Sequence, residues 1–83
     1  MNELEERRRD LLRNLALHAS LARRRMSLSL TDAARLAGLT PEGLITVERG
    51  AVCPLSLAAV EQLTLFLGLT ACGLPRPRPA GMQ

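Results

Sequence analysis

The stretch Ser29–Gly50 constrains the fold of this chain more than any other part. Two short helical patterns meet in it at Gly38. Glycine adopts the left-handed backbone conformation that ends a helix, and it does so without a side-chain penalty. Ala34 lies four residues before this glycine, and its small side chain lets two helix axes approach closely. The stretch therefore predicts two short helices joined by a tight turn.

The second helix of this pair has a strong start signal. Thr40, Pro41 and Glu42 supply an N-cap, a first-turn proline and an acid near the positive helix end. The spacing of Leu44 and Val47 turns both side chains inward. The outer face then carries Pro41, Glu42, Ile45, Thr46 and Arg49. A helix held out in this way has the shape of one that enters the major groove of DNA.

The composition predicts an all-α fold. With 83 residues the chain forms one small domain, which buries only about 60% of its unfolded surface. Its single Phe and its lack of Trp and Tyr leave Leu, Ala, Val and Met to build the core. β-Branched residues are sparse, and apolar residues recur at helical spacing. We expect a compact domain of four helices, or five, that begins with a long N-terminal helix.

The N-terminal helix is marked by apolar residues at Leu11, Leu15, Ala19 and Ala22. Asn2 is a capping residue at its start, and the run Arg23–Arg25 complements the negative end of its dipole. The pattern fits one helix over this whole span, or a helix that breaks before Leu11. Residues 1–12 are therefore interpreted as an extension continuous with the first helix of a domain at 13–70.

The remaining elements follow from caps and apolar spacing. A short helix starts near Ser29 and ends at Ala37, and Ser56 caps a last helix. The inner residues of that last helix are Leu57, Val60, Leu63, Thr64 and Leu67. Alternating Pro and Arg beyond it predict an extended, flexible tail over residues 71–83.

Charge is distributed unevenly along the chain. The net charge is +3, and every basic residue is Arg. Residues 1–27 carry seven Arg against four acids, whereas residues 28–70 carry two Arg against four acids. A positive flank therefore borders a slightly acidic centre. The planar arginine fork suits phosphate recognition, but an Arg-only chain is equally explained by the base composition of a genome.

The chain shows no pattern of catalytic or metal chemistry. Cys53 and Cys72 lack the spacing of a metal or redox pair, and His18 is the only histidine. We expect two free thiols, no metal, no cofactor, no small-molecule ligand and no enzymatic activity. The N-terminus has no apolar signal segment, and no apolar run is long enough to span a bilayer. These features predict a cytoplasmic protein.

From about Arg13 to Leu69 the sequence resembles the phage-repressor-like helix-turn-helix family, also called the XRE-type or lambda-repressor-like family. The matching residues are Leu28, Ser29, Ala34, Ala37, Gly38, Leu39, Leu44, Val47, Glu48, Arg49, Gly50, Leu67, Gly68 and Leu69. The resemblance implies a DNA-binding transcriptional regulator, most simply a homodimeric repressor on an inverted-repeat operator. By analogy, a chain this small is similar to the repressors of plasmids, phages and toxin–antitoxin operons.

The resemblance also implies roles for individual residues. Arg23 matches the first-helix arginine that pairs with the glutamate at Glu48. Pro41, Glu42 and Thr46 match positions that contact base edges. The positions expected to contact phosphate or to flank the site are Arg23, Arg24, Arg25, Ser29, Thr40 and Arg49.

Three departures from the family pattern bear on function. Leu30 stands where relatives commonly have a phosphate-binding glutamine. The base-edge positions lack the Arg, Gln and Asn that give the strongest readout. No room remains for a fifth helix of normal length, so a dimer needs another interface. The candidates for it are Leu4, Leu11, Leu12, Leu65 and Phe66. An alternative function is therefore a protein–protein adaptor that keeps the scaffold without DNA readout.

Overall fold

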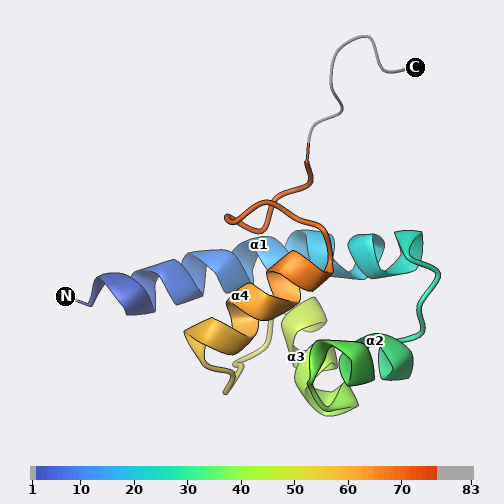
Figure 1. The fold of residues 1–83 in the computed structure, drawn as a ribbon. Coiled ribbons are helices and arrows are strands. Elements are labelled where there is room, and N and C mark those ends of the chain that lie inside the picture. The colour runs from blue at the N-terminus through green and yellow to red at the C-terminus, as the bar shows by residue number, and fades with distance from the viewer. Residues whose placement is uncertain (1, 77–83) are drawn as a thin grey trace, which may run out of the picture.

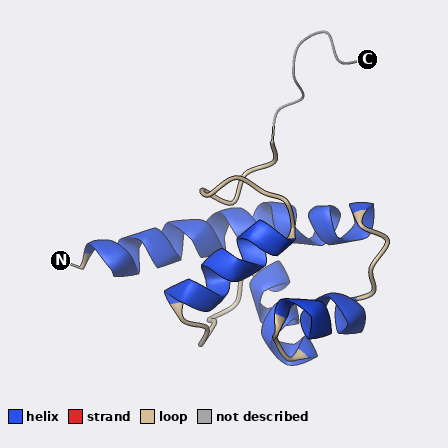
Figure 2. Cartoon of the chain, viewed as in Figure 1, coloured by secondary structure: helices blue, strands red, loops and turns tan. Residues whose placement is uncertain are grey.

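The chain folds into four α-helices within residues 2–76, the part that the computed structural model describes. Figure 1 shows the long first helix along one side of the molecule, with the last helix against it and the two short helices grouped at one end. The helices are α1 (Glu3–Arg25), α2 (Leu30–Ala37), α3 (Pro41–Arg49) and α4 (Leu57–Phe66). Loops connect them, and residues 2–76 contain no strand (Figure 2). The predicted all-α fold of four helices is confirmed.

α1 is one unbroken helix of 23 residues, so the break considered before Leu11 does not occur. The side chain of Asn2 caps it by accepting the Leu4 N–H at 2.9 Å. Its buried residues are Leu11, Leu15, Ala19 and Ala22, the four that the spacing predicts. The first turns of α1 are exposed and extend beyond the other helices (Figure 1).

Serine and threonine hydroxyls start each of the three other helices. The hydroxyl oxygens of Ser29, Thr40 and Ser56 accept first-turn N–H groups at 3.1, 3.0 and 3.2 Å. Gly38 ends α2 with φ +77°, and Gly50 ends α3 with φ +70°. These caps are the ones that the sequence predicts, and they fix where the chain turns between α2 and α3.

The core lies where α1 packs against α3 and α4, and where α2 packs against α3. Leucine and alanine side chains fill most of it, as the composition predicts. Ala33 and Ala34 of α2 are 0% exposed, so α2 and α3 approach closely. The buried residues of the core are Leu11, Leu15, Ala19, Ala22, Ala33, Ala34, Leu44, Val47, Cys53, Val60, Leu63, Leu67 and Leu69.

Two arginines near the start of α1 tie it to distant parts of the chain. The Arg8 guanidinium donates to the carbonyl oxygen of Leu55 at 2.7 Å and to that of Cys53. The Arg7 guanidinium pairs with the Glu61 carboxylate at 3.1 Å. Arg8 therefore holds the loop before α4 against α1, and Arg7 holds α4 itself. Sequence reasoning missed these contacts, because the partners lie 45 to 54 residues away.

Residues 70–76, called here the C-terminal strap, lie against α1. The Asn14 side chain donates to the carbonyl oxygen of Cys72 at 2.8 Å. The Arg76 guanidinium reaches back and donates to the carbonyl oxygen of Gly68 at 3.2 Å. The strap is thus attached both to α1 and to the end of α4.

The strap differs from the tail that the sequence predicts. A turn closed by the Thr70 N–H and the Leu74 carbonyl oxygen, 2.8 Å apart, stands where a fifth helix would begin. The sequence places the start of a flexible tail at residue 71, whereas the structure holds residues 71–76 in place through these hydrogen bonds. The rest of that tail, residues 77–83, lies outside the described residues.

Gly73 shows how closely the strap packs. Its φ is +81°, and a Cβ added there would lie 2.9 Å from Leu11 Cδ1 and 3.3 Å from Asn14 Cβ. We expect Gly73→Ala to lower the free energy of unfolding by about 2–3 kcal/mol, through backbone strain and the clash together. Gly68→Ala is the matched control, because Gly68 has φ +74° and open space around it. Gly68→Ala should lower the free energy of unfolding by about 1 kcal/mol. Urea unfolding followed by circular dichroism measures this free energy for both variants. Equal losses would contradict a closely packed strap.

Candidate nucleic-acid interface

α3 is anchored along its inner face and open along its outer face. Leu44 is 0% exposed and Val47 is 1% exposed, so both lie in the core as predicted. The outer face carries Glu42 and Arg49, which are exposed, and Pro41, Ile45 and Thr46, which are half-buried.

An ion pair joins the end of α1 to α3. Arg23 Nε lies 2.7 Å from Glu48 Oε2, and Arg23 Nη2 lies 3.1 Å from Glu48 Oε1. A third bond runs from Arg23 Nη1 to the carbonyl oxygen of Leu28 at 3.0 Å. The two side chains are 14% and 10% exposed, and the hydrogen bond with Glu48 raises the pKa of Arg23 above its ordinary value. This is the pairing that the family resemblance implies.

Arg23 is therefore turned into the molecule rather than toward a partner. Its three hydrogen bonds leave the phosphate contacts expected of the Arg23–Arg25 run to Arg24 and Arg25. Both are exposed in the last turn of α1, the turn that Arg23 fixes against α3. Their charges also complement the negative end of the α1 dipole, so the two interpretations of the run are compatible.

The hydroxyl of Thr46 has a partner within its own helix. Thr46 Oγ1 donates to the carbonyl oxygen of Glu42 at 2.7 Å, one turn earlier. This bond uses the hydroxyl proton and leaves the lone pairs, so Thr46 accepts rather than donates in this conformation. The ionised Glu42 carboxylate also only accepts. The outer face of α3 thus presents hydrogen-bond acceptors at the two polar positions to which the resemblance assigns base contacts, Glu42 and Thr46.

Ser29 and Thr40 lie at the N-termini of α2 and α3. Each hydroxyl oxygen accepts a backbone N–H and keeps its own proton, which is available for donation to a phosphate oxygen. The helix dipoles add positive character at both places. Leu30, by contrast, packs partly buried against the core. At the position where the resemblance implies a phosphate ligand, the leucine therefore contributes to packing.

The five apolar residues considered for a dimer interface fall into three groups. Leu4 and Leu65 are 63% and 66% exposed. Leu12 and Phe66 are partly buried against the core. Leu11 is 2% exposed and lies under the C-terminal strap, so its assignment to an interface between copies is wrong.

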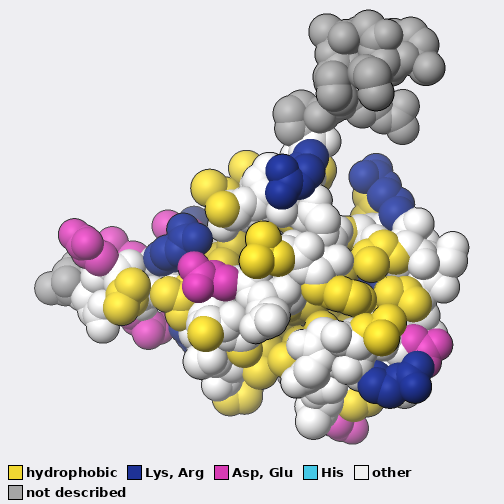
Figure 3. Space-filling model, viewed as in Figure 1, with side chains coloured by type: hydrophobic (Ala, Val, Ile, Leu, Met, Phe, Trp, Pro, Cys, Tyr) yellow, Lys and Arg dark blue, Asp and Glu magenta, His cyan; other side chains and the backbone are white. Residues whose placement is uncertain are grey.

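Sequence reasoning missed several further exposed apolar residues, of which two are the most exposed. Val52 is 98% exposed and Leu17 is 72% exposed. Val52 lies in a loop, where no periodic pattern applies, and Leu17 lies on the side of α1 away from its buried residues. Figure 3 shows that hydrophobic side chains form patches on the face of the molecule in view, with charged side chains around them.

Residues 2–76 hold no group of three or more His, Cys, Asp or Glu side chains placed to bind a metal ion. Cys53 is buried, Cys72 is exposed, and both are free thiols. Within the same residues, no helix combines the length and the apolar character that crossing a bilayer needs.

The chain matches no family model, no curated protein and no solved structure. The residues and geometry described above therefore carry the functional assignment. Its two strongest features are the helix pair joined at Gly38 and the open outer face of α3.

Proposed function

We propose that this chain is a sequence-specific DNA-binding transcriptional regulator, a homodimeric repressor of an inverted-repeat operator. α3 enters the major groove, and two copies place their α3 helices about 34 Å apart, one turn of the duplex. The resemblance to phage-repressor-like helix-turn-helix domains implies the same mode of binding. A regulator of this kind works in the cytoplasm, on the nucleoid.

One observation supports the proposal most directly: α3 is fixed in orientation while its outer face stays uncovered. Leu44 and Val47 anchor it, and the Arg23–Glu48 ion pair locks it to α1. A buried ion pair is a weak source of stability compared with apolar packing. Its use at this point favours a role in setting the direction of α3.

The acceptor character of α3 narrows the DNA sequence that it would contact. In the major groove, adenine and cytosine present amino donors, whereas the guanine edge presents acceptors. Glu42 and Thr46 both accept, so we expect them to contact adenine or cytosine. Pro41 offers apolar contact with a thymine methyl group.

Charged residues set the affinity rather than the sequence preference. Arg24, Arg25 and Arg49 are exposed and supply the contacts with phosphate. Glu42 repels phosphates, which lowers binding to unrelated DNA. Affinity should therefore fall steeply with salt, because each arginine–phosphate contact releases counterions.

Selection of bound duplexes from a random pool tests the proposal. We expect a palindromic site, and we expect Thr46→Ala to weaken binding to it by about 1–3 kcal/mol while relaxing the preference at one base pair. Gln62→Ala, which removes an exposed polar side chain from α4, is the control and should change neither. Fluorescence anisotropy titrations at several salt concentrations measure these affinities. A pool without any enriched sequence, together with binding that salt does not weaken, would overturn the proposal.

The composition of the same face favours one alternative. Its base-edge positions hold Pro, Glu and Thr, and the packed Leu30 replaces a phosphate ligand. A protein–protein adaptor would bind a partner through this face instead of DNA. Such an adaptor would yield no enriched duplex in the selection.

A further inference from the structure

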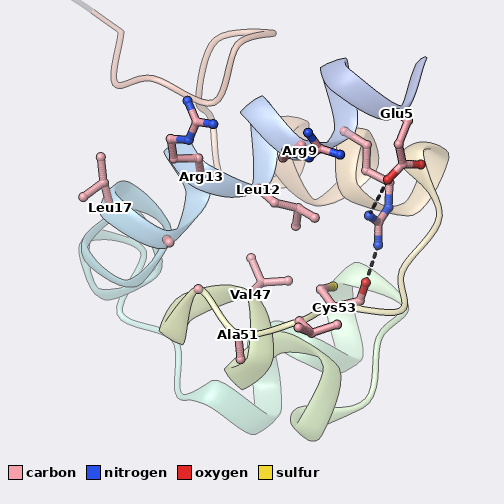
Figure 4. A pocket seen from close by; sticks show the side chains of 12 residues that line it. Glu5, Arg9, Leu12, Arg13, Leu17, Val47, Ala51 and Cys53 are labelled. Atoms are coloured by element: carbon pink, nitrogen blue, oxygen red, sulfur yellow. Dashed lines mark hydrogen bonds and ion pairs between the residues drawn. The ribbon is translucent and has the colours of Figure 1, made fainter. Parts of the chain in front are cut away.

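A groove of about 500 Å³ lies between the N-terminal half of α1 and the loop that follows α3. We call it the α1–loop groove. Figure 4 shows Leu12 of α1 and Val47 of α3 pointing toward one another across it, with Ala51 on the loop side. Arg9 and Arg13 lie along the α1 side. Apolar side chains therefore line its interior, and arginines border it.

Hydrogen bonds keep this groove in shape. The Arg8 guanidinium donates to the carbonyl oxygens of Cys53 and Leu55, which holds the loop at a set distance from α1. Glu5 pairs with Arg8 at 3.4 Å and supports that orientation (Figure 4). The groove is therefore a fixed part of the fold.

Two exposed apolar side chains flank the α1–loop groove. Val52, 98% exposed, stands on the loop side, and Leu17, 72% exposed, stands on the α1 side. One exposed apolar residue is ordinary on a protein surface. Here the two border an apolar hollow, and together they form the kind of continuous apolar surface that marks an interaction site.

We propose that a second copy of this chain docks on the α1–loop groove across a two-fold axis, with Val52 of each copy entering the groove of the other. A two-fold interface uses the same patch twice, so a projecting side chain beside a hollow is self-complementary. The charges agree with this arrangement. Glu3 and Glu6 are exposed in the first turns of α1, and Arg9 and Arg13 follow them. A two-fold axis that crosses α1 at right angles between Glu6 and Arg9 reverses the direction of the helix, so the acids of one copy face the arginines of the other.

The interface deepens the proposed function and rests on it, because an inverted repeat requires two copies. Val47 and Gly50 of α3 line the groove, so a contact formed there also bears on how far apart the two α3 helices lie. The rival patch around Leu65 borders a smaller cavity of about 270 Å³.

Analytical ultracentrifugation of the full chain without DNA tests this interface. We expect the wild-type chain to approach twice its 9.0 kDa mass as its concentration rises. Val52→Arg is expected to raise the dimer dissociation constant by about a hundredfold or more, because the added guanidinium would be desolvated beside the arginines that border the groove. Since Val52 is 98% exposed in the single chain, the variant should keep the helical circular dichroism and the urea midpoint of the wild type. Leu65→Arg, the matched control on α4, should leave the dissociation constant unchanged.

Three results would overturn the inference. A wild-type chain that stays monomeric at every concentration would leave the groove to another kind of partner. A dimer that Val52→Arg leaves intact would place the contact elsewhere, and a dimer that Leu65→Arg dissolves would place it on α4. The measurement needs no DNA, so its failure is distinguishable from failure of the proposed function, which the selection experiment tests separately.

Discussion

Replacing Arg23 with alanine is expected to lower the free energy of unfolding by about 3–5 kcal/mol. The change leaves the Glu48 carboxylate, 10% exposed, without its partner, and it leaves the Leu28 carbonyl oxygen without this donor. A buried charge that loses its partner keeps its desolvation penalty, which is why the loss is large. The total free energy of unfolding of a small domain is only about 5–15 kcal/mol, so we expect this variant to be partly unfolded. Urea unfolding followed by the helical circular dichroism signal measures the loss.

Two further variants separate the buried ion pair from a general effect of removing arginine. Arg35→Ala removes a pair with Asp32 whose side chains are 73% and 52% exposed, and it should cost less than about 1 kcal/mol. Arg23→Lys keeps the charge without the two-pronged geometry, so it should recover part of the stability. If Arg23→Ala cost no more than Arg35→Ala, the pair would not be what locks α1 to α3.

Replacing Leu44 with alanine is expected to cost about 2–5 kcal/mol. Leu44 is 0% exposed on the inner face of α3, so the change removes apolar contacts and leaves a cavity behind the helix. The same urea titration measures the loss. We expect DNA affinity to fall as well, because a loosened α3 no longer enters the groove in one orientation.

Ile45→Ala is the matched control for this prediction. Ile45 is the next residue of the same helix and lies half-buried on the outer face. Its truncation should cost no more than about 1 kcal/mol, because water already reaches the side chain. Similar losses for Leu44→Ala and Ile45→Ala would mean that α3 is not anchored through the face described above.

The helices could be predicted from the sequence because their signals are local. The caps at Ser29, Thr40 and Ser56 and the bend at Gly38 each depend on residues within about one turn. The burial of Leu44 follows from helical spacing once the start of α3 is known. These features of the candidate site therefore needed no knowledge of distant contacts.

The features that the sequence did not reveal depend on segments that meet only in the folded chain. No side-chain pattern marks a carbonyl oxygen as a partner, so the contacts of Arg8 left no local signal. Helical spacing places Leu11 on the inner face of α1, but it gives no sign that the strap, which comes much later in the chain, covers it. The internal hydrogen bond of Thr46 depends on its rotamer, which spacing does not specify. The groove beside Val52 likewise needs α1 and a loop together.

Several hydrogen bonds that hold this fold together run from an arginine to a main-chain oxygen. They join Arg8 to Cys53 and Leu55, Arg23 to Leu28, and Arg76 to Gly68 and Leu69. Every amino acid carries a carbonyl, so the acceptor persists whatever side chain stands there, whereas the donor vanishes with the arginine. The two ends of each hydrogen bond therefore differ in their tolerance to mutation. The arginine cannot be replaced without loss of the bond, whereas the residue that supplies the carbonyl can be replaced by any residue that packs there. During evolution the residue on the acceptor side of each of these hydrogen bonds can change while the bond itself is kept.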